Sequence, residues 1–146
     1  MKAKKDLKIV GWAFLFLALV DVIDLLVDYF TGYFDVENII KIAGNDTTES
    51  VAQIAAIVAI VIILLSMLVK VFFGVKAINQ ANGKTKTTTH ITLAKVVLVI
   101  SVIAAVVMVV SLIQKSATIT DVIISLANVV IYATYIKAAK LVQETK

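Results

Sequence analysis

The sequence predicts an all-α integral membrane protein, with four transmembrane helices in an antiparallel bundle and both termini on the inner side. Two observations support this fold class. Hydrophobic residues make up 61% of the 146-residue chain, and its mean hydropathy is +1.02, above the range of soluble domains. Charged residues also divide the chain into apolar stretches of about 20 residues, the length that a helix needs to cross a bilayer core of about 30 Å.

Each expected span is bounded by charged or turn-forming residues. The first is uncharged over residues 9–20 and then contains aspartates until Phe34. The second lies between Glu49 and Lys70, the third between Lys95 and Lys115, and no proline interrupts any span. The fourth has the shortest clean apolar run. We expect a single four-helix transmembrane domain that covers residues 1–146, with spans at about 9–34, 50–75, 91–114 and 118–141.

The positions of the lysines predict the orientation, because short inner loops of membrane proteins are enriched in positive charge. All 14 basic residues are lysines, and 12 of them lie near one set of span ends. Only Lys41 and Lys115 lie elsewhere, and segment 35–49 is acidic. Both termini are therefore expected to be cytoplasmic. The net charge of +4 forms a collar at the inner membrane face, and the lack of arginine argues against a nucleic-acid partner.

The connections between the spans carry their own signals. Apolar residues at 36, 39, 40 and 42 have helical spacing and predict a short amphipathic helix on the outer surface. Asn82 and Gly83 predict the inner turn. Thr118 and Asp121 have the spacing of a capping box, which predicts that the fourth span begins there and forms a tight hairpin with the third.

Three aspartates in the first span form the main chemical lead. Asp21, Asp24 and Asp28 recur at i, i+3 and i+7, so they lie on one stripe of a helix. Carboxylates inside a span are costly and usually face the bundle interior or a water-filled cavity. With residue 9 as the inner edge, Asp21 lies about 18 Å deep and Asp28 about 28 Å deep. Asp28 is therefore expected in the interface, and Asp21 is the costly group.

A polar partner for Asp21 is expected from the fourth span. Ser125 and Asn128 lie on one face of that helix, and Asn128 is about 13 Å from its outer end, which matches the depth of Asp21. Ser125 similarly matches Asp24. Lys70 is assigned to the inner side of the membrane, too far away to pair with Asp21. The candidate intramembrane polar site therefore consists of five side chains: Asp21, Asp24, Asp28, Ser125 and Asn128.

The aspartate stripe permits two interpretations. In one, Asp21 is hydrogen-bonded and fastens two helices. In the other, the carboxylates line a path for protons or cations. Enzyme chemistry has little support, because the chain lacks cysteine and common catalytic motifs. His90, the one histidine, is expected to be a solvated loop residue. No catalytic residue, cofactor or metal site is predicted.

Residues 72–95 carry a resemblance to a known group. The segment reads Phe-Phe-Gly-Val-Lys-Ala-Ile-Asn-Gln-Ala-Asn-Gly-Lys and continues through Thr-His-Ile-Thr-Leu-Ala-Lys. It resembles the inner loop of small uncharacterised four-span membrane proteins from low-GC Gram-positive bacteria. The resemblance implies a bacterial plasma membrane protein and brings no function with it.

The functional prediction is a non-enzymatic accessory, scaffold or immunity-type protein. It would act through helix–helix or loop contacts with a membrane-protein partner or with a second copy of itself, in contact with the lipid bilayer. The alternative is a small proton- or cation-coupled transporter or channel that uses the Asp21 and Asp24 face of the first span. The two hypotheses differ in whether Asp21 faces water.

Overall fold

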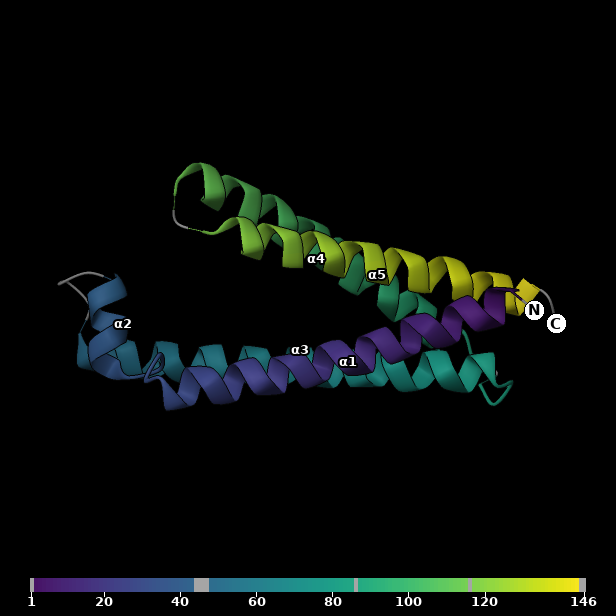
Figure 1. Cartoon of the computed structure of the whole chain (residues 1–146), viewed down its shortest axis with the longest axis horizontal. Coiled ribbons are helices and arrows are strands. Elements are labelled where there is room, and N and C mark those ends of the chain that lie inside the picture. Colours follow the sequence, from purple (N-terminus) through teal and green to yellow (C-terminus); the bar gives the residue numbers. More distant parts are fainter. Residues whose placement is uncertain (1, 44–47, 86, 116, 145–146) are drawn as a thin grey trace. The chain divides into compact units, whose positions relative to one another are not determined.

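The structure is a computed structural model that describes residues 2–43, 48–85, 87–115 and 117–144. Every regular element in these ranges is a helix, as predicted (Figure 1). Four helices are long and apolar enough to cross a membrane, which confirms that part of the predicted fold class. The five helices are α1 (Lys2–Phe30), α2 (Val36–Ala43), α3 (Glu49–Ala81), α4 (Thr89–Ile113) and α5 (Ile119–Glu144).

α1 and α3 differ from the expected spans in where they begin and end. α1 begins at Lys2 and ends at Phe30, where Gly32 adopts a φ of 72°. The amide of Tyr33 donates to the Asp28 carbonyl and that of Gly32 to the Tyr29 carbonyl, which is a Schellman motif. α3 ends in the same way around Gly83, whose φ is 77°, so the predicted inner turn is confirmed. α3 therefore continues well beyond Lys70.

The predicted capping box at the start of α5 is also confirmed. The Thr118 amide and hydroxyl both donate to Oδ2 of Asp121 at 2.8 Å, and the Asp121 amide donates to Oγ1 of Thr118 at 3.3 Å. These reciprocal bonds satisfy amides that the first helical turn leaves without partners. The link between α4 and α5 is consequently short, and the two helices pack together as a helical hairpin.

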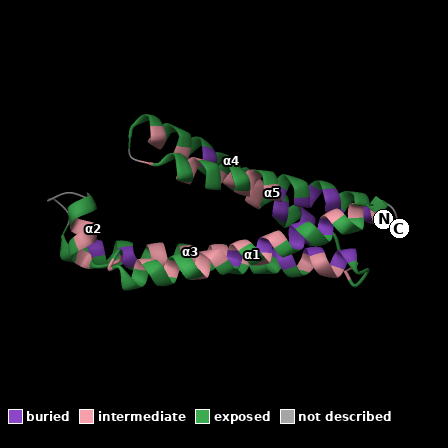
Figure 2. Cartoon of the chain, viewed as in Figure 1, coloured by how far each residue is buried: buried purple, intermediate pink, exposed green. Residues whose placement is uncertain are grey.

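The chain divides into two compact units. The first contains Met1–Phe14 and Phe73–Lys146, and the second contains Leu15–Phe72. An aromatic core lies inside the first unit, where Phe14, Phe73, Tyr132 and Tyr135 are all buried. The ring centroids of the paired residues are 4.9 to 5.9 Å apart in tilted and edge-to-face arrangements. Such geometries are favourable for aromatic pairs. Figure 2 shows that buried residues gather along the C-terminal half of α5. This core ties α1, α3 and α5 together.

Within the same unit, α1 approaches α3 closely at Gly11. A methyl group added at Gly11 would lie 2.8 Å from Cγ1 of Ile78, 2.9 Å from the Gly74 carbonyl oxygen and 3.0 Å from Cβ of Ala77. Small residues allow helix backbones to approach in this way in membranes, where packing drives helix association. Gly11 is therefore required for close packing, not for backbone flexibility.

We expect Gly11→Ala to lower the free energy of unfolding by about 1–3 kcal/mol, because the added methyl group must displace the α3 backbone. Thermal unfolding in detergent micelles, followed by circular dichroism, measures the change. Gly83→Ala is the comparison variant. Nothing lies within 4 Å of a Cβ built at Gly83, so any loss of stability there comes from the positive φ and not from a steric clash. A Gly11→Ala variant as stable as the wild type would contradict the close approach.

The second unit contains the rest of α1, α2 and the first two-thirds of α3. The predicted amphipathic segment is helical, and α2 begins just after Asp35, whose carbonyl accepts from the Ile39 amide at 3.0 Å. Asn38 Nδ2 donates to the Gly32 carbonyl at 2.8 Å and holds α2 against the end of α1. Ala52 and Ala56 of α3 are buried. This unit contains the three aspartates of the first span.

Candidate functional site: an ion pair between two apolar helices

Asp21 of α1 pairs with Lys70 of α3 inside the second unit. Lys70 Nζ lies 2.7 Å from Oδ1 and 2.5 Å from Oδ2 of Asp21, so the ammonium binds both carboxylate oxygens. The side chains are only 10% exposed for Lys70 and 21% for Asp21. Both charges are largely removed from solvent, and each neutralises the other. Such a short, charge-assisted contact is stronger than a bond between neutral groups.

The expectation that no lysine could reach Asp21 was wrong. Lys70 was placed near the inner side because the second span was expected to end at about residue 75, shortly after it. α3 instead continues to Ala81, eleven residues or about 16 Å beyond Lys70. That depth matches the roughly 18 Å of Asp21 measured from Ile9. Taking the end of α3 as the inner edge of the second span, instead of residue 75, would have placed Lys70 at a depth comparable to that of Asp21.

The other two aspartates of the stripe have different surroundings. Asp24 is exposed and Asp28 is half-buried like Asp21, but neither has an ion-pair partner among the described residues. The Thr31 hydroxyl donates to the Asp28 backbone carbonyl at 3.4 Å near the end of α1, and the expected interfacial position of Asp28 stays a prediction. The stripe therefore contains one carboxylate neutralised by a lysine and two without such a partner in the described part of the chain.

Ser125 and Asn128 lie on α5 in the first unit, and both are half-buried. They share a helix face with the buried Tyr132 and Tyr135, which lie four and seven residues beyond Asn128. The predicted Asp21–Asn128 and Asp24–Ser125 hydrogen bonds would each join the two units, so they stay predictions. The structure brings Asp21 together with Lys70, which the sequence reasoning had excluded.

His90 was also misassigned. It is the second residue of α4, only 2% exposed, and its Nδ1 lies 2.6 Å from the Tyr135 hydroxyl of α5. The expected solvated loop position is therefore wrong, because α4 begins early enough to carry His90 into the packed core. Close by, Gln80 Nε2 of α3 donates to the Ala139 carbonyl at 2.8 Å. Tyr135 and Ala139 are one helical turn apart, so α5 anchors both neighbouring helices.

His90, Tyr135 and Gln80 form a second polar cluster, the His90 cluster, in which two buried polar atoms have no partner among the described residues. The Tyr135 hydroxyl can donate its proton to His90 Nδ1, which assigns the remaining ring proton of a neutral imidazole to Nε2. His90 Nε2 and Gln80 Oε1 are buried and have no hydrogen-bond partner among the described residues. His90 Nε2 is then a donor and Gln80 Oε1 an acceptor. The spacing of Gln80, His90 and Tyr135 gave no sequence signal, because they come from three helices.

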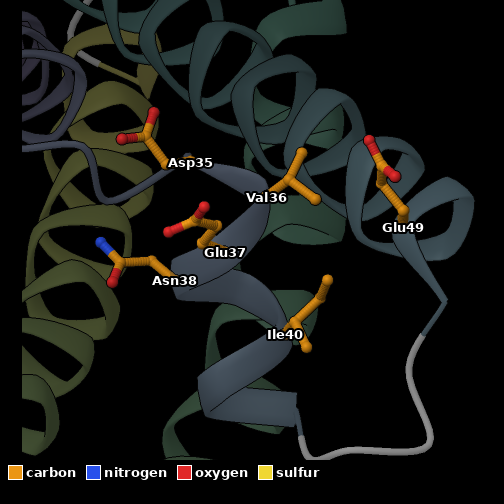
Figure 3. A pocket seen from close by; sticks show the side chains of 6 residues that line it. All are labelled: Asp35, Val36, Glu37, Asn38, Ile40 and Glu49. Carbon is orange, nitrogen blue, oxygen red and sulfur yellow. The ribbon is translucent and has the colours of Figure 1, made fainter.

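An acidic pocket of about 720 Å³ lies beside α2 in the second unit. Asp35, Glu37 and Asn38 form its polar wall, and Val36 and Ile40 lie on the side of α2 that faces Glu49 (Figure 3). No group of three acidic or histidine side chains in the described part of the chain comes together closely enough to hold a metal ion. The pocket thus offers a negatively charged surface at the predicted outer end.

Taken together, the geometry defines a helical protein with membrane-spanning composition and a desolvated ion pair between two of its apolar helices. Comparisons with known protein families, with curated proteins and with solved structures found no match.

Proposed function

We propose that this chain is a multi-pass protein of a bacterial plasma membrane, with α1, α3, α4 and α5 as an antiparallel four-helix bundle. The length and apolar composition of these helices support membrane insertion. The lysines support an orientation with both termini in the cytoplasm, because they gather at the ends of α1 and α5 and in the loop between α3 and α4. α2 then lies on the outer surface.

Single-cysteine labelling tests this topology cleanly, since the chain has no native cysteine. In intact cells, a membrane-impermeant maleimide should label Lys41→Cys on α2 and should leave Lys4→Cys and Lys84→Cys unlabelled until the membrane is permeabilised. Lys4 and Lys84 lie at different inner segments, so each controls for the other. Labelling of Lys84→Cys in intact cells would contradict the proposed orientation.

We further propose that the protein is a non-enzymatic accessory protein that acts by binding a membrane partner. The observation that carries this proposal is the Asp21–Lys70 pair. A carboxylate already neutralised by a lysine of the same chain is suited to fastening α1 to α3. Asp24, one turn farther along α1, is exposed. A carboxylate at that depth needs a polar partner, which Ser125 or a helix of another protein would supply.

A photo-crosslinking residue placed on the acidic outer segment or beside Asp24 tests partner binding in membranes. We expect one discrete cross-linked species from positions 33 and 23, and its loss when Glu37→Gln or Asp24→Asn, respectively, is added. Cross-linking from the buried position 18 serves as the control. Cross-links to lipid alone at every exposed position, or a species unaffected by the acidic substitutions, would contradict partner binding through these groups.

Transport is the second candidate, because paired ionisable residues inside spans also mark proton and ion pathways. On that hypothesis, the Asp21–Lys70 pair would exchange protons with a substrate path. The substitution Asp21→Asn alone does not separate the hypotheses, because it leaves the Lys70 ammonium unpaired. The double variant Asp21→Asn/Lys70→Gln removes both charges and is the informative comparison.

A further inference from the structure

A pocket of about 350 Å³ lies between the first turns of α1 and the last part of α5, inside the first unit. Its lining combines two opposite charges with small and apolar side chains. Asp6 comes from α1, and α5 contributes Ala133, Thr134, Lys137, Ala138 and Leu141. The pocket plays no part in the Asp21–Lys70 pair or in the His90 cluster.

The two charged groups of the pocket are available to a ligand. Asp6 is half-buried and Lys137 is exposed, and neither has a hydrogen-bond or ion-pair partner within the described ranges. The Thr134 hydroxyl donates to the Val130 carbonyl at 2.7 Å, which leaves its oxygen free to accept. The pocket thus presents a cation, an anion and a neutral acceptor. A ligand that carries both a negative and a positive group matches this set.

The position along the helices indicates where such a ligand would come from. Asp6 precedes the first apolar run by three residues, and Lys137 directly follows the last apolar residue of the run 122–136. On the proposed topology, both therefore lie at the level of the inner lipid head groups. Beyond the pocket toward the membrane centre, Val130 is 62% exposed and continues the surface with apolar side chains.

We propose that this pocket binds the head group of a phospholipid with a primary amine, of the phosphatidylethanolamine class. Lys137 pairs with the phosphodiester and Asp6 accepts hydrogen bonds from the ammonium, while the acyl chains follow the apolar surface of α5 near Ala133 and Val130. This inference depends on the membrane insertion proposed above. The lysine collar alone would favour anionic lipids. Asp6 disfavours a second negative charge, and a quaternary amine lacks the N–H donors that Asp6 would accept.

Native mass spectrometry of the detergent-solubilised full chain tests the proposal with added phosphatidylethanolamine, phosphatidylcholine or phosphatidylglycerol. We expect the wild type to bind phosphatidylethanolamine about fivefold more tightly than the other two, the effect of one partly exposed ion pair. Asp6→Asn should abolish this preference, and Lys137→Gln should weaken binding of all three lipids. Glu37→Gln and Lys84→Gln, which change charge elsewhere, should bind like the wild type.

Ala133→Phe keeps both charges and fills the pocket, so it should abolish the preference even if the charge variants fold poorly. Equal binding of the three lipids, tighter binding of phosphatidylglycerol, or a preference that survives both Asp6→Asn and Ala133→Phe would overturn the proposal. The cysteine-labelling pattern separates this outcome from failure of the proposed topology. Sided labelling without lipid preference removes only the lipid site, whereas loss of sided labelling removes the membrane topology itself.

Discussion

Lys70→Met is expected to lower the free energy of unfolding by about 3–5 kcal/mol, the largest effect of any single substitution considered for this chain. The substitution leaves the Asp21 carboxylate largely buried between apolar helices with no countercharge. The Asp21→Leu variant should be destabilised by a similar amount, since it leaves the Lys70 ammonium in the same position. Unfolding in mixed micelles, followed by far-ultraviolet circular dichroism, provides the measurement.

The double variant Asp21→Leu/Lys70→Met should regain most of the lost stability, because a buried ion pair and a well-packed apolar pair often differ little in free energy. The double-mutant cycle therefore has a predicted coupling of several kcal/mol. Asp28→Leu, which removes a half-buried carboxylate of the same stripe, should change stability far less. Additive effects of the two single substitutions would contradict a direct Asp21–Lys70 interaction.

Tyr135→Ala is expected to have a comparably large effect, a loss of about 3–5 kcal/mol. Tyr135 is fully buried, and its ring contacts Phe14, Phe73 and His90. Removing the ring leaves a cavity and also leaves the His90 Nδ1 without its partner. Tyr135→Phe keeps the packing and removes only the hydroxyl, so its expected cost is about 1–3 kcal/mol.

Nuclear magnetic resonance of the imidazole separates the two contributions. The chain has a single histidine, so its ring signals are unambiguous. The nitrogen shifts should report a neutral ring with its proton on Nε2 in the wild type and should change in Tyr135→Phe. Tyr132→Phe is the matched control, one turn away on the same helix. An unchanged His90 signal in Tyr135→Phe would contradict the hydrogen bond between the two rings.

The parts of the fold that depend on local sequence were predictable. Four apolar runs, the Thr118–Asp121 capping box and the turn at Gly83 each follow from residues close together in the chain, and the structure confirms them. The amphipathic spacing after Asp35 likewise predicted α2. These features depend on helix periodicity and capping, which act within a few residues.

The contacts between helices were predicted less well, because they depend on where each helix ends. Ending the second span at about residue 75 placed Lys70 close to the inner edge and away from Asp21, although α3 continues for three turns beyond Lys70. His90 was placed in a loop because three threonines precede it, yet α4 begins at Thr89 and Tyr135 lies opposite. Partners 45 and 49 residues apart leave no trace in local spacing.

Proton and cation flux into liposomes that contain the purified protein tests the central claim, that the Asp21–Lys70 pair fastens two helices of an accessory protein. Wild type is compared with Asp21→Leu/Lys70→Met, after circular dichroism shows that both are folded. We expect no flux above that of empty liposomes for either protein. Flux in the wild type that disappears in the folded double variant would contradict the account and make the ion pair part of a transport path.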